Sequence, residues 1–323
     1  HRDLHSFPTR RSSDLVHSDN IKFETSEINF LSGQDLFTAG RTLFKSTLTD
    51  FGQQQRKLFF CIANGLLDNA AELIAGVREE SRHDIPVFFA GCSDNYRFQK
   101  NYQFHKDQIM TDGAVSLILG GRLQVGIGVG HGFNPLGKPR SIDKTDGNCV
   151  LSINGRPACS LYEEFFGAEA TTLKNGLLGP INFRYPLGLR CPGDRTFSLR
   201  SVLGIRADGA LICQDHIPPQ AEVHIMIGNQ DSFLAAAEDA ARQVKDQLQG
   251  QHPGLIIVVE SLSRLRFLSR QAHQEAEAIL DILGKDVPLL GMYSLDEYST
   301  LDTEAPNDRV LLQNGNIMVL AIC

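Results

Sequence analysis

Two long stretches of the chain show the same order of apolar and polar positions. Each begins with a short apolar run, at residues 58–61 and 255–259, that is typical of a buried strand. A helical pattern follows in both, with apolar side chains three or four residues apart. Each then continues into a second apolar run, at residues 85–91 and 287–291, and later into a turn sequence before another strand. We therefore predict an α+β fold of two related lobes, in which mixed β-sheets pack against helices and the unit strand–helix–strand–hairpin is duplicated.

The segments between these units carry patterns of their own. The predicted elements are helices at 34–51 and 231–248, strands at 98–110, 122–133 and 222–227, and a hairpin at 196–212. The sequence SLYE at 160–163 fits a capping box that opens a short helix ending at Gly167. The stretch 136–154 is polar and rich in turn formers, so it is the candidate boundary between a domain of residues 16–150 and a domain of residues 151–323.

The first fifteen residues, HRDLHSFPTRRSSDL, differ from the rest of the chain. They lack the apolar core of a secretion signal. They resemble translated sequencing-adapter text, so we expect a non-native artefact at residues 1–15 and leave it out of the fold prediction. On this interpretation the native N-terminus is missing and the chain is a fragment.

Composition narrows the class of protein. Of the 323 residues, 42% are apolar and 21% charged, as in soluble globular proteins. The net charge of −7 and the pI of about 5.8 argue against a nucleic-acid-binding protein. No apolar run approaches the ~20 residues that span a membrane. Seven scattered cysteines without a CxxC pair predict a reduced, cytoplasmic protein. We expect no cofactor and no metal, because Cys213, Asp215, His216 and His224 lack the paired spacing of zinc ligands.

Two glycine patterns lie near residue 130. The sequence GFNPLGK at 132–138 fits a phosphate-binding loop, but Pro139 stands where such a loop needs Ser or Thr. Nucleotide binding is therefore not favoured. Glycines also alternate from Gly126 to Gly132, which places them on one face of a strand. Either a ligand or a neighbouring element must approach that face closely, and we favour the neighbouring element.

Cys92 ends a predicted strand and is followed by Ser93 and Asp94, while His131 ends another strand. A thiolate nucleophile needs a nearby base and a group that orients the base. These residue types are present, so a Cys-dependent hydrolase using Cys92 and His131 is an alternative function. A buried, inert cysteine is the more common case.

Charged and aromatic side chains gather past the strands of the second unit. Arg264 follows the first strand of that unit, and Tyr293 and Glu297 follow the second. Ligand sites in α/β proteins favour loops outside strand ends. If the two strands are neighbours, these side chains converge with Ser261 and offer both charges and an aromatic wall, which suits a zwitterion such as an amino acid. A structural Arg–Glu pair is the alternative interpretation.

Four short motifs in this order resemble the FIST family, named for F-box and intracellular signal transduction. They are GHGFNPLGKP at 130–139, PACSLYEEFFG at 157–167, VPLLGMY at 287–293, and Asn314 before a final apolar strand. The resemblance runs from about residue 30 to residue 323. It implies the C-terminal part of a FIST N-terminal domain followed by a FIST C-terminal domain.

The resemblance also implies a function. It indicates a non-enzymatic, intracellular sensor that binds a small molecule, with amino acids as the expected ligands. A separate signalling protein, such as a histidine kinase or chemoreceptor, would recognise whether the ligand is bound. Binding to nucleic acid or to a membrane is not expected. Two positions depart from the family pattern: Ser261 stands near a frequent cysteine, and Asp296 replaces the glycine before Glu297. The expected ligand-binding residues are Cys92, Ser93, Asp94, His131, Ser261, Arg264, Tyr293, Glu297 and Asn314. A ligand-free interaction scaffold, with an exposed apolar patch in place of a pocket, is a further alternative.

Overall fold

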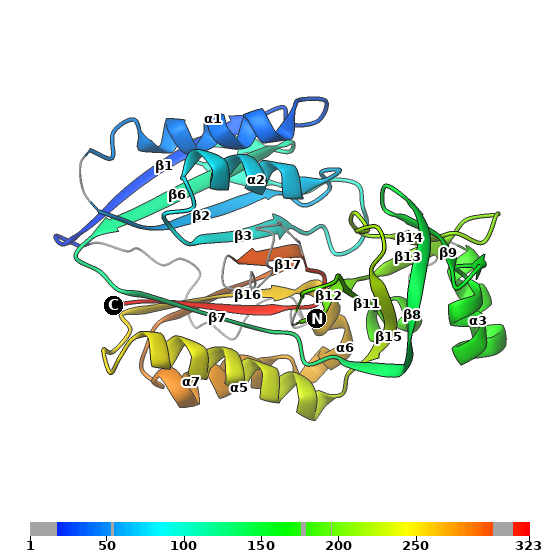
Figure 1. Ribbon diagram of the computed structural model, residues 1–323. Helices are drawn as coiled ribbons and strands as arrows, with labels where there is room; N and C mark the ends of the chain where they lie inside the picture. Colours follow the sequence, from blue (N-terminus) through cyan, green and yellow to red (C-terminus); the bar gives the residue numbers. More distant parts are fainter. Residues whose placement is uncertain (1–17, 53–54, 176–178, 195, 300–312) are drawn as a thin grey trace.

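The computed structural model describes residues 18–52, 55–175, 179–194, 196–299 and 313–323. The expected artefact at residues 1–15 lies outside the described residues. Within the described part, the strands form an eight-stranded sheet, a seven-stranded sheet with a short strand paired to it, and a two-stranded hairpin (Figure 1). The α+β class predicted from the sequence is confirmed.

The eight-stranded sheet has the order β1-β6-β2-β3-β17-β16-β18-β7. Its strands are β1 (Ile21–Asn29), β6 (Gly113–Gly121), β2 (Arg56–Asn64), β3 (Val87–Cys92), β17 (Leu289–Ser299), β16 (Leu255–Ser261), β18 (Ile317–Ile322) and β7 (Val125–Gly130). Each half contains one parallel pair, β2/β3 or β16/β17, followed outward by two antiparallel strands. The second half repeats the first in mirrored order, which confirms the predicted duplication.

Each half carries its own pair of helices on one face of the sheet (Figure 1). Helices α1 (Leu36–Leu48) and α2 (Ala70–Glu80) pack on the first half, and α5 (Gln230–Gln247) and α7 (His273–Leu283) on the second. Apolar side chains on the opposite face contact one another in a separate cluster. The halves join where β3 and β17 run antiparallel, with Cys92 opposite Ser294.

The eight-stranded sheet is strongly curled. Strand β6 is second in the order and β7 is eighth, so in a flat sheet six spacings of ~4.8 Å would separate them by ~29 Å. The four Cα–Cα steps from Gly121 to Val125 reach at most ~15 Å. The sheet therefore has to bend until its ends approach each other. Along this connection, Arg122 N donates to Asn20 O (3.1 Å), which extends the β1–β6 pair, and Gln124 N donates to Cys323 O (3.2 Å), which extends the β18–β7 pair.

The glycine stripe of β7 allows α5 to lie directly on the strand. A Cβ on Gly128 would stand 1.9 Å from the carbonyl oxygen of Ala240, and one on Gly132 2.5 Å from that of Ser232. The predicted close packing of a neighbouring element is thus confirmed. The same helix also protects the outer edge of β7. Gln243 exchanges hydrogen bonds of 3.0 Å with the backbone N–H and carbonyl of Val129, which would otherwise be open to strand pairing.

The second sheet is inserted between β7 and α5, with the order β12-β11-β15-β8-β9-β14-β13 and β10 beside β9. Its strands are β8 (Asn134–Asp146), β9 (Cys149–Ile153), β10 (Arg156–Pro157), β11 (Leu187–Arg190), β12 (Ser198–Arg200), β13 (Val202–Ile205), β14 (Leu211–Cys213) and β15 (Glu222–Ile227). Its core also includes side chains of α3 (Ser160–Phe166), η1 (Gly167–Asn175) and α4 (Pro180–Arg184). The polar stretch 136–154, the candidate domain boundary, forms most of the β8–β9 hairpin.

Several local predictions need correction. Helix α3 ends at Gly167 as predicted, but Cys159 occupies its N-cap without a capping hydrogen bond, so Ser160 is the first helical residue and not the cap. The predicted strand 98–110 is a short hairpin of β4 (Gln103–His105) and β5 (Gln108–Met110). Strand β17 extends to Ser299, so the polar stretch expected past its end lies within it. Among the described helices, none combines the length and apolar character that a membrane crossing requires.

Candidate functional site

The four residues predicted to converge in the second unit do share one region, but it is the interior of the protein. Strands β16 and β17 are neighbours as expected, with Ser261 opposite Ser294. Arg264 lies on α6 (Leu262–Leu268), directly after β16. Ser261, Arg264 and Glu297 each have 0% of their surface exposed, whereas Tyr293 is half-buried. The convergence therefore forms a buried polar cluster rather than the open pocket that was predicted.

Arg264 forms an ion pair with Glu275 of α7, at 3.2 Å from Nε to Oε1, and a second contact joins Nη2 to the same oxygen. Its guanidinium also lies over the ring of Phe233, 4.6 Å from the ring centre. The structural Arg–Glu pair left open by the sequence is therefore formed, with Glu275 rather than Glu297. Glu275 lies three residues after Ala272 and four before Ile279, on the buried face of α7, whereas Glu277 of the same helix is exposed.

Glu297 and Asp296 are held by amides and hydroxyls. The Ser294 hydroxyl donates to Glu297 at 2.5 Å, and the side chain of Asn314 donates to Asp296 at 2.7 Å. Burial raises the pKa of Glu297 well above its ordinary value. Burial, and then the charge of Asp215, raise the pKa of Asp296 to about 8. Both carboxyl groups therefore tend to keep a proton at neutral pH, which lowers the cost of burying them.

Ser93 and Asp94 organise the loop after β3. The Asp94 carboxylate accepts hydrogen bonds from four successive backbone N–H groups, at residues 97–100, over 2.6–3.1 Å. Burial alone would raise the pKa of Asp94, but these donors bring it below its ordinary value. The Ser93 hydroxyl accepts from Asn95 N at 3.0 Å. These bonds give both residues a local structural role.

Cys92 and His131 lie far apart. Strands β17, β16 and β18 separate β3, which ends at Cys92, from β7, which His131 follows. Measured along the curled sheet, the path between them is four strand spacings, or ~19 Å. The Cys92 thiol donates instead to the carbonyl oxygen of Tyr102 at 3.6 Å. Burial also raises the pKa of the Cys92 thiol, which disfavours a thiolate. The Cys–His pair required by the alternative hydrolase is therefore not formed.

An open cavity of about 400 Å³ begins where the chain leaves β7. Its walls are the turn at residues 129–134, one side of α5 between Ser232 and Gln243, the segment of Gln313 and Asn316, and the pair Thr196 and Phe197. Of the predicted site residues, His131 lines this cavity. Its volume falls within the ~300–1,000 Å³ usual for small-ligand sites.

The ring of His131, which lines this cavity, carries one hydrogen-bond donor. Its Nδ1 accepts the backbone N–H of Phe133 at 2.9 Å. Burial, and then the guanidinium of Arg264, lower the pKa of His131 to about 4, so the ring is neutral at pH 7. A neutral imidazole that accepts at Nδ1 carries its proton on Nε2. The neutral His131 ring therefore has one N–H group and one occupied acceptor.

Sequence reasoning missed the other polar residues of the cavity. Gln313 accepts the backbone N–H of Leu199 at 2.9 Å, and this bond links the eight-stranded sheet to the second sheet. Asp239 and Gln243 lie on the side of α5 that lines the cavity. In the sequence they are indistinguishable from the solvent-exposed polar residues of an amphipathic helix. The one signal in the sequence for this cavity was the glycine alternation. It marks the stretch where α5 packs directly on β7, and the cavity begins where these two elements separate.

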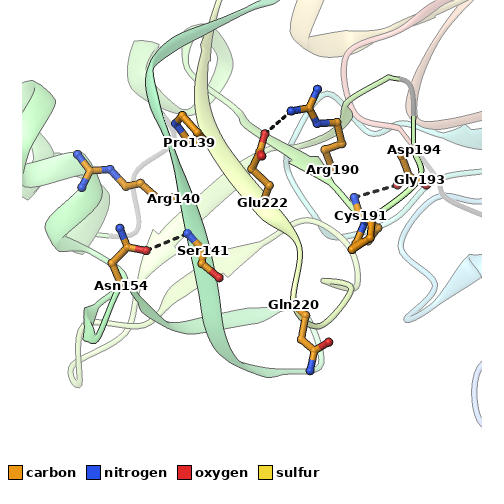
Figure 2. Close-up of a pocket in the computed structure, with 11 residues that line it drawn as sticks. Pro139, Arg140, Ser141, Asn154, Arg190, Cys191, Gly193, Asp194, Gln220 and Glu222 are labelled. Atoms are coloured by element: carbon orange, nitrogen blue, oxygen red, sulfur yellow. Dashed lines mark hydrogen bonds and ion pairs between the residues drawn. The ribbon is translucent and has the colours of Figure 1, made fainter.

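A second cavity, of about 530 Å³, lies in the second sheet between β8, β15 and the loop after β11 (Figure 2). Several of its charged and polar groups are paired with one another. Arg190 donates to Glu222 at 2.7 Å, and Cys191 N donates to Asp194 at 3.0 Å. None of the predicted site residues lines it. Nor do the described residues contain a group of three or more His, Cys, Asp or Glu side chains suited to a metal ion.

The fold and this site define a class: an α+β protein with a curled sheet of two related halves, an inserted second sheet, and a pocket of mixed polar and apolar lining where the sheets meet. The family models identify it further. A FIST N domain matches residues 13–156 and a FIST C domain matches residues 158–299, so the chain belongs to the FIST family. FIST domains are associated with sensing in signal transduction.

The chain is also similar to curated proteins that carry no functional description. It is 28% identical over 100 residues to an uncharacterized protein of Methanocaldococcus jannaschii, a match that covers 31% of the chain and 19% of the relative. It is 27% identical over 203 residues to uncharacterized proteins of two Mycobacterium tuberculosis strains, covering 60% of the chain and 51% of each relative. The matched region thus spans about half the length, or less, of these relatives.

Proposed function

We propose that this chain is a small-ligand sensory module whose ligand occupies the 400 Å³ cavity beside His131. The observation that carries the proposal is a cavity of ligand size lined by His131, whose neutral ring accepts at Nδ1 from Phe133 and therefore carries its proton on Nε2. The family's association with sensing supports a signalling role. The state of the module passes to a separate signalling protein.

The lining of this cavity suits a small zwitterion such as an amino acid. The His131 N–H donates to a ligand carboxylate. The Asp239 carboxylate already accepts from Arg242 at 2.6 Å, and its second oxygen attracts a ligand ammonium group. Phe133 and Phe197 supply apolar surface for a side chain. The mixture of a few polar groups with apolar walls is typical of small-molecule sites.

The position of the cavity gives a route from ligand to partner. Its walls come from both sheets, since Thr196 and Phe197 belong to the insertion and Gln313 and Asn316 to the segment before β18. A ligand that binds one arrangement of the two sheets better than another shifts the population toward it. The partner protein then recognises the favoured arrangement.

Thermal unfolding of the chain with a panel of amino acids and small carboxylates tests the proposal. A ligand at ~100 times its dissociation constant adds about 2.7 kcal/mol of stability to the folded state, which gives a clear rise in Tm. The rise should saturate and should be lost in His131→Ala. The matched control is His252→Ala, because His252 is exposed in the loop between α5 and β16 and is not among the residues that line the cavity. A rise that survives in His131→Ala would contradict the proposed site.

The interaction scaffold stays the alternative because the β4–β5 hairpin carries exposed apolar side chains. Phe104 and Ile109 are paired across the hairpin and are 67% and 65% exposed. If no compound of the panel changes Tm, this alternative gains weight. Replacing both residues by serine should then abolish binding of the signalling partner without changing Tm.

A further inference from the structure

Arg264 lies directly behind the cavity and contacts three of its walls. Nη1 donates to the carbonyl oxygen of His131 at 2.6 Å and to that of Gly315 at 3.3 Å, and Nη2 donates to that of Phe233 at 3.1 Å. His131 belongs to the turn after β7, Phe233 to the first turns of α5, and Gly315 to the segment between Gln313 and Asn316. One buried side chain therefore joins three separate segments of the chain at the point where the pocket forms.

The geometry requires a guanidinium group. All five N–H donors of Arg264 have acceptors, counting the two bonds to Glu275, and none remains for a ligand. Burying a charge with 0% exposure is costly unless every donor is paired. A lysine at this position has three donors on one atom, so it cannot reach acceptors spread around a planar fork.

We propose that Arg264 is the positioning residue of this pocket: it fixes the three walls and the orientation of His131 without touching the ligand. The sequence prediction placed Arg264 in contact with a ligand anion, and the geometry assigns it this indirect role instead. This inference rests on the proposed function only in taking the cavity as a ligand site. The placement of the walls is a property of the ligand-free protein.

The positioning role extends to α7 through Glu275. Glu275 lies in the first turn of α7 and is the counter-ion that keeps the guanidinium in place. Glu260 also lies 3.8 Å from Arg264 Nε. Burial, and then the charge of Glu275, raise the pKa of Glu260 well above its ordinary value, so Glu260 is the protonated partner. The pocket walls are thereby connected to the helix that packs beside α5 on the outer face.

Nuclear magnetic resonance of the His131 ring in the ligand-free chain tests the inference. In Arg264→Gln the pKa of His131 should rise from about 4 by about one unit or more, because a positive charge next to it is removed. The backbone N–H of Phe133 should exchange faster, since it would lose a fixed acceptor. Asp239, the acidic residue that α5 contributes to the cavity, is unchanged in this variant.

Arg266→Gln is the matched control. Arg266 lies on the same helix but is exposed and donates to Asn95 at 2.6 Å, away from the cavity. Its replacement should leave both the His131 pKa and the Phe133 exchange unchanged. If Arg264→Gln folds with an unchanged His131 pKa and unchanged Phe133 exchange, Arg264 is not the positioning residue.

A second measurement keeps the inference falsifiable if Arg264→Gln does not fold. In the unmodified chain, the Nε–H of Arg264 should exchange with solvent far more slowly than that of Arg266, because its donors are all engaged. Equal exchange rates would overturn the inference. If the amino-acid panel does not raise Tm, that result counts against the proposed function alone. The resonance measurements on Arg264→Gln and on the unmodified chain involve no ligand.

Discussion

The two halves of the eight-stranded sheet have the same topology, but their helices make the closest backbone contacts with different neighbours. In the first half, the close contact is between helices: a Cβ on Gly40 of α1 would stand 2.0 Å from the carbonyl oxygen of Leu73 on α2, and one on Gly76 2.0 Å from that of Phe37. In the second half, the close contact is between α5 and β7, along the glycine stripe. Glycine position thus decides which neighbours a helix approaches, even within one repeated topology.

The strand ends of the two halves also differ. At the ends of β2 and β3 the buried groups are mainly amides, with Asn101 donating to Asn64 at 2.9 Å and Asn64 donating to Asp112 at 3.3 Å. At the end of β16 the buried groups are charged, and the ion pair of Arg264 and Glu275 lies among them. The second half also carries the inserted sheet between β7 and α5. The pocket forms there because the insertion leads the chain away from α5 just after His131.

The largest effect is expected at the charged centre of the second half. Glu275→Gln removes the counter-ion of buried Arg264, so the free energy of unfolding should fall by about 3–5 kcal/mol. Glu260→Gln should change it by less than about 1 kcal/mol, because Glu260 is already neutral. Urea denaturation of both variants measures the difference. Equal losses of unfolding free energy in the two variants would show that both glutamates share the negative charge, and would contradict the assignment of Glu275 as the counter-ion of Arg264.

The glycine contacts come next. Gly128→Ala places a methyl group 1.9 Å from a helix carbonyl and should cost about 3 kcal/mol. Gly40→Ala should cost a similar amount in the first half. Hydrogen exchange should locate the damage on β7 and α5 for Gly128→Ala, and on α1 and α2 for Gly40→Ala. Gly254→Ala is the control, since its nearest neighbour is Ile322 O at 3.8 Å; damage spread equally over both halves would contradict the comparison.

Asp296 predicts that the free energy of unfolding falls as pH rises, by up to about 1.4 kcal/mol per pH unit. Its pKa is about 8 in the folded protein, above the ordinary value of 3.8, so the folded state binds the extra proton between these values. The free energy of unfolding should therefore fall as pH rises from about 4 to 8. In Asp296→Asn this fall should be smaller, while Asp215 and Arg200 remain. Identical pH profiles for variant and parent, measured by urea denaturation at pH 5 and pH 8, would refute the raised pKa.

The smallest effect is expected in the loop after β3. Asp94→Asn replaces one acceptor oxygen by a donor that faces backbone N–H groups, at a cost of about 1 kcal/mol. Hydrogen exchange should accelerate at residues 97–100 and leave the sheets unaffected. Asp107→Asn, at the exposed turn between β4 and β5, should change neither quantity. Unchanged exchange in Asp94→Asn would contradict the role given to this carboxylate.

Much of the local structure could be predicted because apolar periodicity survives in the sequence. Strand β15 matches the predicted range 222–227, and the duplication follows from two similar patterns. The predicted strand ended too early because four residues near the end of β17 are polar yet buried: Ser294, Asp296, Glu297 and Ser299. Their partners, such as Asn314, are distant in sequence, so a polar strand interior looked like a loop.

The candidate site was predicted less completely for the same physical reason. His131 was identified because it ends a glycine-rich strand, and the structure places it on the cavity. Arg264 looked like a residue at a strand end that faces a ligand, because sequence cannot show which carbonyl groups surround a side chain. Asp239 on α5 looked like an ordinary solvated residue. Sheet order and curl, which create the cavity, depend on pairing between strands more than 150 residues apart.

A titration of the His131 ring tests the central claim most directly. The ring resonances would be followed by nuclear magnetic resonance while amino acids and small carboxylates are added, with His252 as the internal reference. The account predicts that one of these compounds shifts the His131 signal saturably and leaves His252 unmoved. Saturable binding of a compound that leaves the His131 signal unchanged would contradict the assignment of this cavity as the ligand site.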